Sequence, residues 1–529
     1  MHLPVLVVAF AACASAVRAS SSFLKHRKAA RNIRGQNDNP LARRADVADV
    51  GKLPEIVPAA TAPKPKYLNA KTLKYSVNGR KIPDVNFDVG ESYAGLMPIS
   101  ASPKESRQLY FWFFPTANTE KQDNVGADDE ILIWLNGGPG CSSLEGLFQE
   151  KWPVSMAVRN SWHRITNVVW VEQPVSTGFS QGTATAKSSA DAAWQFGGFW
   201  ENFMKTFDLQ GKKIYIIGES YAGTSIPYIA DYMIARKDNS LYNFLGSMLY
   251  DPLIGEHHVQ DIIPAARCVD KWKDLFGLND TFMATIQKKA HKRGYTDYMN
   301  KYLVFPPAGP QPTVPVDPAP GCDVWMDIFE AVLLINPCFD IYQIATTCPL
   351  LWDNLGFPGS QEYLPDGAHV YFDRADVKKA IKAPNVSWNT CSVENVFVGY
   401  ENGADLARSP IFGVLPRVIN HSDRTVIAHG QLDFVLIEDG TLLAIQNMTW
   451  KGHMGFGKPP VEPFLVPYHP DGPLGALAGA GVFGTAHTER GLTYSSVKLA
   501  GHMVPQYAPS AAYRQVQYLL GRIDSLNKV

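Results

Sequence analysis

The chain contains 529 residues, of which 46% are hydrophobic and 19% are charged, and its formal net charge is −1. This length allows a large buried core, and the nearly balanced charge provides no basic excess that would attract nucleic acid. We therefore expect a globular protein without a nucleic-acid partner.

The amino terminus has the composition of a secretory signal peptide, which we predict over residues 1–19. An apolar run from Leu3 to Ala16 is too short to cross a bilayer and is followed by small residues. A basic, polar stretch then ends at Arg43-Arg44, which predicts a propeptide over 20–44 and a folded mature domain over 45–529. An unprocessed, disordered tail is the alternative.

The rest of the chain shows no second long apolar segment and no hydrophobic carboxyl-terminal tail. We therefore expect no membrane anchor and a route through the secretory pathway, to the exterior or to a vacuole or lysosome. Removal of the signal leaves an even number of cysteines, which predicts three disulfides in an oxidising compartment: Cys141, Cys268, Cys322, Cys338, Cys348 and Cys391. Glycosylation sequons occur at Asn279, Asn385, Asn420 and Asn447.

Short apolar runs with strand character recur along the chain, with segments of helical length between several of them. They cover 109–114, 131–135, 168–171, 214–217 and 425–428. This alternation predicts an α/β protein with a mixed, mostly parallel sheet flanked by helices. The composition changes over 251–366, where charged helical sequence gives way to a proline-rich stretch, and we predict an insertion there.

A glycine-bounded turn after the run 214–217 presents one serine. The segment Gly218-Glu219-Ser220-Tyr221-Ala222-Gly223 precedes a helix-like sequence, so a strand, a sharp turn and a helix follow one another. This is the construction of a nucleophile elbow, which exposes a hydroxyl to a base and to oxyanion donors. A plain strand-to-helix turn is the alternative, because Ala222 stands where the generic pattern has glycine.

Three further strand ends carry residues that complete such a site. The loop after 131–135 contains Gly137-Gly138, whose backbone can approach a ligand closely, and we pair the amides of Gly138 and Tyr221 as oxyanion donors. Downstream, Asp433 follows the run 425–428, and His502 follows another predicted strand. We interpret the competing His429 as a structural residue, since the glycine after it suits a turn.

Four motifs in this order, WLNGGPGCSS, GESYAG, HGQLD and GHMVP, resemble those of the serine carboxypeptidases, and the similarity extends over most of 67–522. The resemblance implies an α/β-hydrolase fold with an inserted cap region. It implies that Ser220 attacks the peptide carbonyl, His502 transfers the proton and Asp433 orients the imidazole. The oxyanion would bind the amides of Gly138 and Tyr221.

The same resemblance implies a site for the carboxylate of a peptide or protein C-terminus, made by Asn136, Gly137, Glu150 and Glu219. Two acids can bind an anion if they share protons, because crowding and burial raise carboxyl pKa values. We therefore expect activity to be favoured at acidic pH. The family also suggests a Cys141–Cys391 disulfide, and the other four cysteines allow three pairings.

Three features depart from the family pattern. The segment between Glu150 and Ser161 is short, Ser176 stands where glycine is usual, and Asp251 lies where a Gly-Asn pair is common. We expect these departures to alter the shape of the pocket and to leave Ser220, Asp433 and His502 unaffected.

The predicted function is that of a serine-type carboxypeptidase, which releases single amino acids from peptide carboxyl ends through an acyl-enzyme. An acyltransferase on the same scaffold and a peptide-binding homologue with weakened catalysis remain alternatives, and an ester or lipid hydrolase fits the acidic motif less well. We expect no cofactor and no metal, because none of the 13 histidines belongs to an HxxE or HExxH pattern.

Overall fold

The computed structural model describes residues 65–117, 127–150, 161–313, 323–350, 353, 355, 369–399, 403–467 and 480–528, with residues 149 and 150 described by their backbone alone. The predicted signal peptide and propeptide lie outside the described residues, as does Cys322.

One large mixed sheet organises the fold, in the strand order β1-β2-β3-β5-β4-β6-β7-β8-β13-β12-β11. Its six central strands are parallel, namely β5 (Asn167–Glu172), β4 (Glu130–Leu135), β6 (Lys213–Glu219), β7 (Phe244–Tyr250), β8 (Arg424–Gly430) and β13 (Leu492–Val497). Antiparallel strands extend both edges, namely β1 (Ser76–Asn78), β2 (Glu91–Pro98), β3 (Gln108–Phe114), β12 (Gly481–Glu489) and β11 (Pro463–Val466). The predicted fold class is confirmed.

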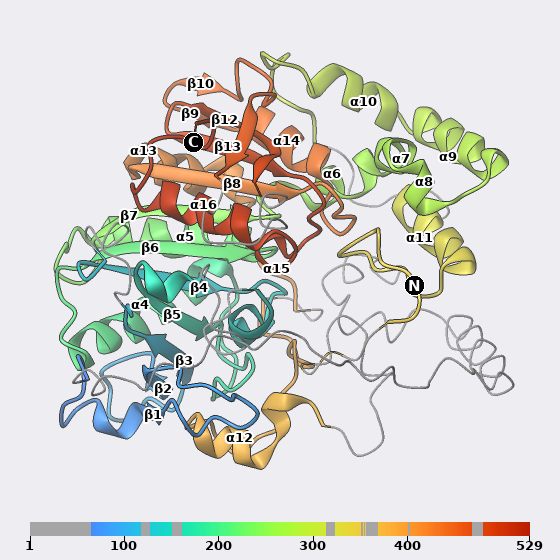
Figure 1. Cartoon of the computed structure of the whole chain (residues 1–529). Coiled ribbons are helices and arrows are strands. Elements are labelled where there is room, and N and C mark those ends of the chain that lie inside the picture. The colour runs from blue at the N-terminus through green and yellow to red at the C-terminus, as the bar shows by residue number, and fades with distance from the viewer. Residues whose placement is uncertain are drawn as a thin grey trace, which may run out of the picture.

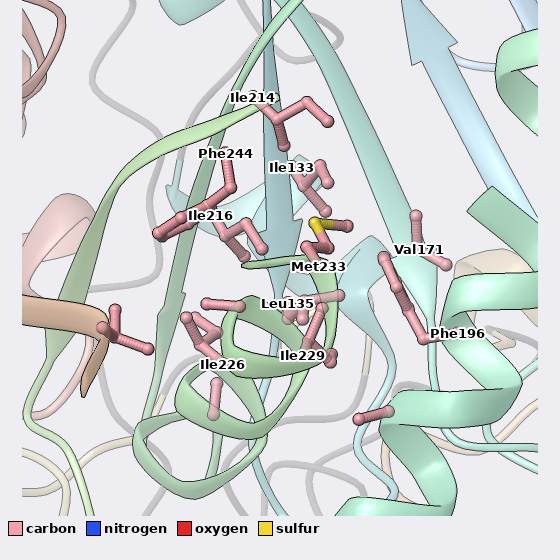
Figure 2. Packing of buried hydrophobic residues seen from close by; sticks show 14 of the residues in the cluster. Ile133, Leu135, Val171, Phe196, Ile214, Ile216, Ile226, Ile229, Met233 and Phe244 are labelled. Carbon is pink, nitrogen blue, oxygen red and sulfur yellow. The ribbon is translucent and has the colours of Figure 1, made fainter. Parts of the chain in front are cut away.

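Helices cover both faces of the central strands, which explains why the residues of these strands are buried almost throughout rather than alternately buried and exposed. On one face, α4 (Ser189–Thr206) and α5 (Ala222–Arg236) pack on residues such as Ile216. Figure 2 shows Ile226, Ile229 and Met233 of α5 among side chains from the neighbouring strands. On the other face, α16 (Pro509–Leu519) packs against the cluster that contains Ile217.

The described residues of the segment between β7 and β8 form helices rather than strands, and several of these helices share a hydrophobic core with Leu432, Phe434 and Ile437 from the loop after β8. Figure 1 shows α7 to α11 gathered to one side of the sheet. These helices are α6 (His257–Gln260), α7 (Ile262–Lys271), α8 (Lys273–Phe276), α9 (Asp280–Lys292), α10 (Tyr295–Tyr302) and α11 (Val324–Ile335). They occupy the segment predicted as an insertion.

The remaining elements are short. They are η3 (Leu73–Tyr75), α3 (Ser143–Glu145), the π-helical turn η4 (Gly146–Glu150), η5 (Trp162–Arg164), η7 (Tyr371–Asp373), α12 (Ala375–Ala380), η8 (Pro410–Phe412), α13 (Val414–His421), α14 (Glu438–Gln446), the hairpin β9 (Thr449–Trp450) and β10 (His453–Met454), and α15 (Val504–Tyr507). Across the described ranges, no helix combines the length and the apolar character needed to span a membrane.

Candidate active site

Ser220 sits in the turn between the end of β6 and the start of α5. Its φ of 61° lies in the left-handed region, which is costly for a residue with a β-carbon. The backbone is held there by hydrogen bonds from the Ser220 amide to the Tyr250 carbonyl (3.0 Å) and from the Leu253 amide to the Ser220 carbonyl (3.0 Å). The turn at the end of β7 therefore fixes the serine in its strained position.

Asp433 and His502 meet at the same edge of the sheet, in the loops after β8 and β13. Nδ1 of His502 lies 2.7 Å from Oδ2 of Asp433, and both side chains are buried. Oδ1 of Asp433 accepts the amides of Val435 (2.7 Å) and Leu436 (3.3 Å). Nε2 of His502 has no hydrogen-bond partner among the described residues. The pair thus leaves one imidazole nitrogen available for a proton.

His429 lies close to the same pair but is engaged differently. Its Nε2 donates to the Leu436 carbonyl (2.8 Å) and is 3.8 Å from Oδ2 of Asp433. Burial lowers the pKa of this fully enclosed imidazole, although Asp433 opposes the effect. The structure therefore brings His502, and not His429, into direct hydrogen bonding with Asp433.

The glycine loop after β4 packs directly on the serine turn. A β-carbon at position 137 would lie 2.5 Å from Cβ of Ser220 and 2.6 Å from the amide nitrogen of Tyr221. Gly138 has a φ of 109°, which lets the backbone turn sharply at this point. The loop is anchored by the Cys141–Cys391 disulfide and by the Ser392 amide, which donates to the Gly140 carbonyl (2.8 Å).

The residues predicted to bind a substrate carboxylate are partly brought together. Nδ2 of Asn136 donates to Oε1 of Glu219 (2.9 Å), and Oδ1 of Asn136 accepts from the Trp134 indole. Glu219 is only 4% exposed. Glu150 ends η4, and its side chain is not among those described.

Sequence reasoning missed two buried acids beside the His502–Asp433 pair. Asp251, expected from the sequence to change only the shape of the pocket, lies beside Asp433, whose contact with His502 is intact. Asp340 interacts electrostatically with His502 and Asp433, and burial raises its pKa to about 7, although the hydrogen bond from the Tyr342 amide acts in the opposite direction. The replacement of the common Gly-Asn pair was the only sequence signal for Asp251.

Asp251, His429 and Asp433 could in principle offer ligand atoms to a cation, since these atoms lie within 4.8 Å of one another. The hydrogen bonds already present argue against that use. Oδ2 of Asp433 holds His502, and Nε2 of His429 carries the proton it donates to Leu436. A metal would have to displace both interactions.

The remaining predicted residues are placed as follows. A second disulfide joins Cys338 and Cys348, whereas Cys268 is buried and forms no disulfide within the described residues, so the expected third bridge is not tested. Among the sequon asparagines, Asn447 is half-buried. The other three are exposed, namely Asn279, Asn385 and Asn420.

A strained serine between a parallel strand and a helix, with an Asp-His pair on later strand ends, defines an α/β-hydrolase. A model of the family described as serine carboxypeptidase matches residues 83–522. The chain belongs to this family.

Known proteins agree with this assignment. The chain is 52% identical to a probable serine carboxypeptidase of Arthroderma benhamiae over 99% of both chains. It is 44% identical to serine-type carboxypeptidase F of Aspergillus niger, with 87% of this chain and 89% of that protein aligned. The fold matches the crystal structure of Kex1, a prohormone-processing carboxypeptidase of Saccharomyces cerevisiae, with a TM-score of 0.65 and 20% identity over 86% of this chain and 98% of that one. The family predicted from sequence is confirmed.

Proposed function

We propose that this serine-type carboxypeptidase releases single amino acids from the carboxyl ends of peptides, with Ser220 as nucleophile, His502 as general base and acid, and Asp433 as the residue that orients His502. The observation that carries the proposal is the 2.7 Å contact between His502 Nδ1 and Asp433 Oδ2. That contact fixes the imidazole tautomer and directs Nε2 away from Asp433, as a base for a serine requires.

The reaction follows from these roles. Nε2 of His502 takes the hydroxyl proton as Ser220 Oγ bonds to the terminal peptide carbonyl, and the amides of Gly138 and Tyr221 stabilise the tetrahedral oxyanion. The proton passes to the leaving nitrogen, the terminal amino acid departs, and an acyl-enzyme remains. Water then attacks the ester with His502 again as base, which regenerates Ser220 and frees the shortened peptide.

Recognition of the free carboxyl end falls to Asn136, Gly137, Glu150 and Glu219 in this proposal. The enclosure of Glu219 supports it, because burial favours the neutral form of an acid, and a buried acid that keeps its proton can donate a hydrogen bond to an incoming carboxylate. Loss of that proton would replace attraction by repulsion. Substrate binding should therefore weaken as pH rises.

The test compares peptides that differ only in a free or amidated carboxyl end, over pH 4 to 8, by measuring released amino acids. We expect cleavage of the free-acid peptides and a loss of at least 1,000-fold in kcat for Ser220→Ala. A fluorophosphonate probe should label the wild-type protein and not the variant. Equal cleavage of both peptides would contradict recognition of the carboxyl end, and an active Ser220→Ala would contradict the nucleophile.

We further propose that the chain passes through the secretory pathway and is processed after Arg44. The sequence signals at residues 1–44 and the three exposed sequon asparagines support this. Amino-terminal sequencing and glycosidase treatment of material collected from a culture test it. A mature chain that begins at Ser20 would contradict processing at Arg43-Arg44.

A further inference from the structure

Asp251 follows β7 directly and lies at the centre of the site without a role in the proposed reaction. Its side chain is fully buried, and its amide donates to the Ala428 carbonyl of β8 (2.8 Å). The flanking Tyr250 carbonyl and Leu253 amide hold the backbone of Ser220. One short turn thus contacts the nucleophile through its backbone and the Asp433 loop through its side chain.

The two carboxyl oxygens of Asp251 have different surroundings. Oδ1 accepts the Gly430 amide (2.8 Å) and lies 3.4 Å from Nε2 of His429, whose proton goes to the Leu436 carbonyl. No donor from the described part of the chain reaches Oδ2. A carboxyl oxygen of Asp433 lies within 4.8 Å of one of Asp251. An ionised Asp251 would therefore leave a buried oxygen unsatisfied and face a second anion.

Among the described residues, the charged and titratable groups that act on Asp251 include no lysine or arginine. They are Asp433 from the loop after β8, His429 from β8, Glu438 from α14 and Tyr494 from β13. Burial, and next the negative charge of Asp433, raise the pKa of Asp251 well above its usual range. The same enclosure lowers the pKa of His429, which favours the neutral form of this imidazole.

We propose that Asp251 is a positioning residue, held in its neutral form, whose carboxyl proton is donated to Asp433 and keeps that carboxylate ionised and oriented toward His502. This inference rests on the proposed roles of Asp433 and His502. Asp433 already accepts two backbone amides and the His502 imidazole. A further donor stabilises its ionised form, which a carboxylate working in acid requires.

The backbone at this position permits a sharp test. Asp251 has a φ of 41°, in the left-handed region that glycine, asparagine and aspartate tolerate. Asp251→Asn keeps an acceptor for the Gly430 amide and offers a neutral donor to Asp433. Asp251→Gly removes both groups without backbone strain. Comparison of the two variants therefore distinguishes the effect of the donated hydrogen bond on activity from the effect of the turn conformation.

Both variants and the wild type are assayed as the full chain with a free-acid peptide from pH 4 to 8, with rates expressed per fluorophosphonate-reactive site. We expect Asp251→Asn to keep kcat within about 3-fold and to leave the acid limb of kcat/KM in place. Asp251→Gly should lose at least about 10-fold in kcat with KM within about 3-fold, because substrate binding does not involve this residue.

Two results would overturn the inference. Equal kcat for the Asn and Gly variants would show that no donated hydrogen bond is needed. A shift of the acid limb to lower pH in Asp251→Asn would show that the native residue is ionised, since an extra anion stabilises protonated His502. If Asp251→Gly does not fold, the pH profile of Asp251→Asn still shows whether the native Asp251 is neutral or ionised. Asp433→Asn serves as a separate control: full activity there would refute the assignment of Asp433 itself.

Discussion

At the scale of single residues, the contact between Gly137 and the serine turn is the most exacting feature of the site. A methyl group at position 137 has no space beside Ser220 and Tyr221, at 2.5 Å and 2.6 Å. We expect Gly137→Ala to displace the turn and to reduce kcat/KM by about 100-fold, since small errors in placing a nucleophile cost that much. Steady-state kinetics with a free-acid peptide measure the effect.

The matched control is Gly413→Ala. Gly413 has an extended φ of 175°, and the nearest atom to an added β-carbon is the end of the Arg417 side chain at 3.5 Å. This variant should retain the activity of the wild type. If Gly137→Ala were equally active, the close packing of the two turns would not matter for catalysis.

Glu219 offers a second prediction at this scale, on the pH dependence of substrate binding. For the wild type, we expect KM for a free-acid peptide to rise between pH 5 and pH 8, as protons are lost from the carboxylate-binding acids. Glu219→Gln cannot ionise and keeps a donor, so its KM should vary less over the same range. Amidated peptides serve as the control, and a Glu219→Gln enzyme that no longer bound substrate at pH 5 would argue against proton sharing.

Asp433 and His502 were predictable as neighbours because parallel strands end at one edge of a sheet, and Ser220 follows another parallel strand of the same sheet. Asp251 was not, although it follows β7 in the same way. Gly246 and Ser247 interrupt the apolar pattern of that strand. A β-carbon at 246 would lie 2.7 Å from the Arg424 carbonyl, so close packing against β8 requires glycine at this position. Because that glycine breaks the apolar run, the sequence pattern did not predict the strand.

At the scale of elements, the Cys141–Cys391 disulfide joins the glycine loop to a segment 250 residues away, whereas Cys338–Cys348 closes a loop of 10. Loop-closure entropy predicts that the first bridge stabilises the fold by about 3 kcal/mol more than the second. We therefore expect a larger loss in the free energy of unfolding for Cys141→Ala/Cys391→Ala than for Cys338→Ala/Cys348→Ala.

Activity should separate these two double variants further. Without its bridge the glycine loop depends on hydrogen bonds such as that from the Ser392 amide to Gly140. We expect kcat of Cys141→Ala/Cys391→Ala to fall below that of the other variant, measured where both are folded by circular dichroism. Equal stability and equal kcat would show that the distant anchor has no part in shaping the loop.

At the scale of the whole molecule, the sequence predicted the class of the sheet correctly but did not predict all of its strands. The expected runs correspond to β3, β4, β5, β6 and β8. Strand β12 was hidden for the same reason as β7, because glycines such as Gly484 allow the neighbouring backbone to approach and dilute the apolar pattern. The edge strand β11 is only four residues long and begins at Pro463. The predicted insertion over 251–366 rests on the distinct charge and proline content of that segment, which contains α6 to α11.

Global stability should also depend on Glu172, at the end of β5 beneath the glycine loop. It accepts hydrogen bonds from the Ser142 hydroxyl and the Phe179 amide, and burial raises its pKa from 4.5 to about 7. Between these values the unfolded chain has lost the proton that the folded chain keeps. The stabilisation is therefore complete below pH 4.5 and is lost as pH rises through 7.

Glu172→Gln keeps one acceptor and one donor for the Ser142 hydroxyl and the Phe179 amide. Because glutamine cannot ionise, the stability of this variant does not depend on pH through position 172. Relative to the wild type, we expect its free energy of unfolding in urea to improve by roughly 1 to 3 kcal/mol between pH 4.5 and pH 8. Exposed Glu394→Gln should show no such trend, because a solvated carboxyl has the same surroundings in both states. A constant difference between Glu172→Gln and the wild type would mean that Glu172 is ionised throughout, and that the floor of the glycine loop carries a buried negative charge.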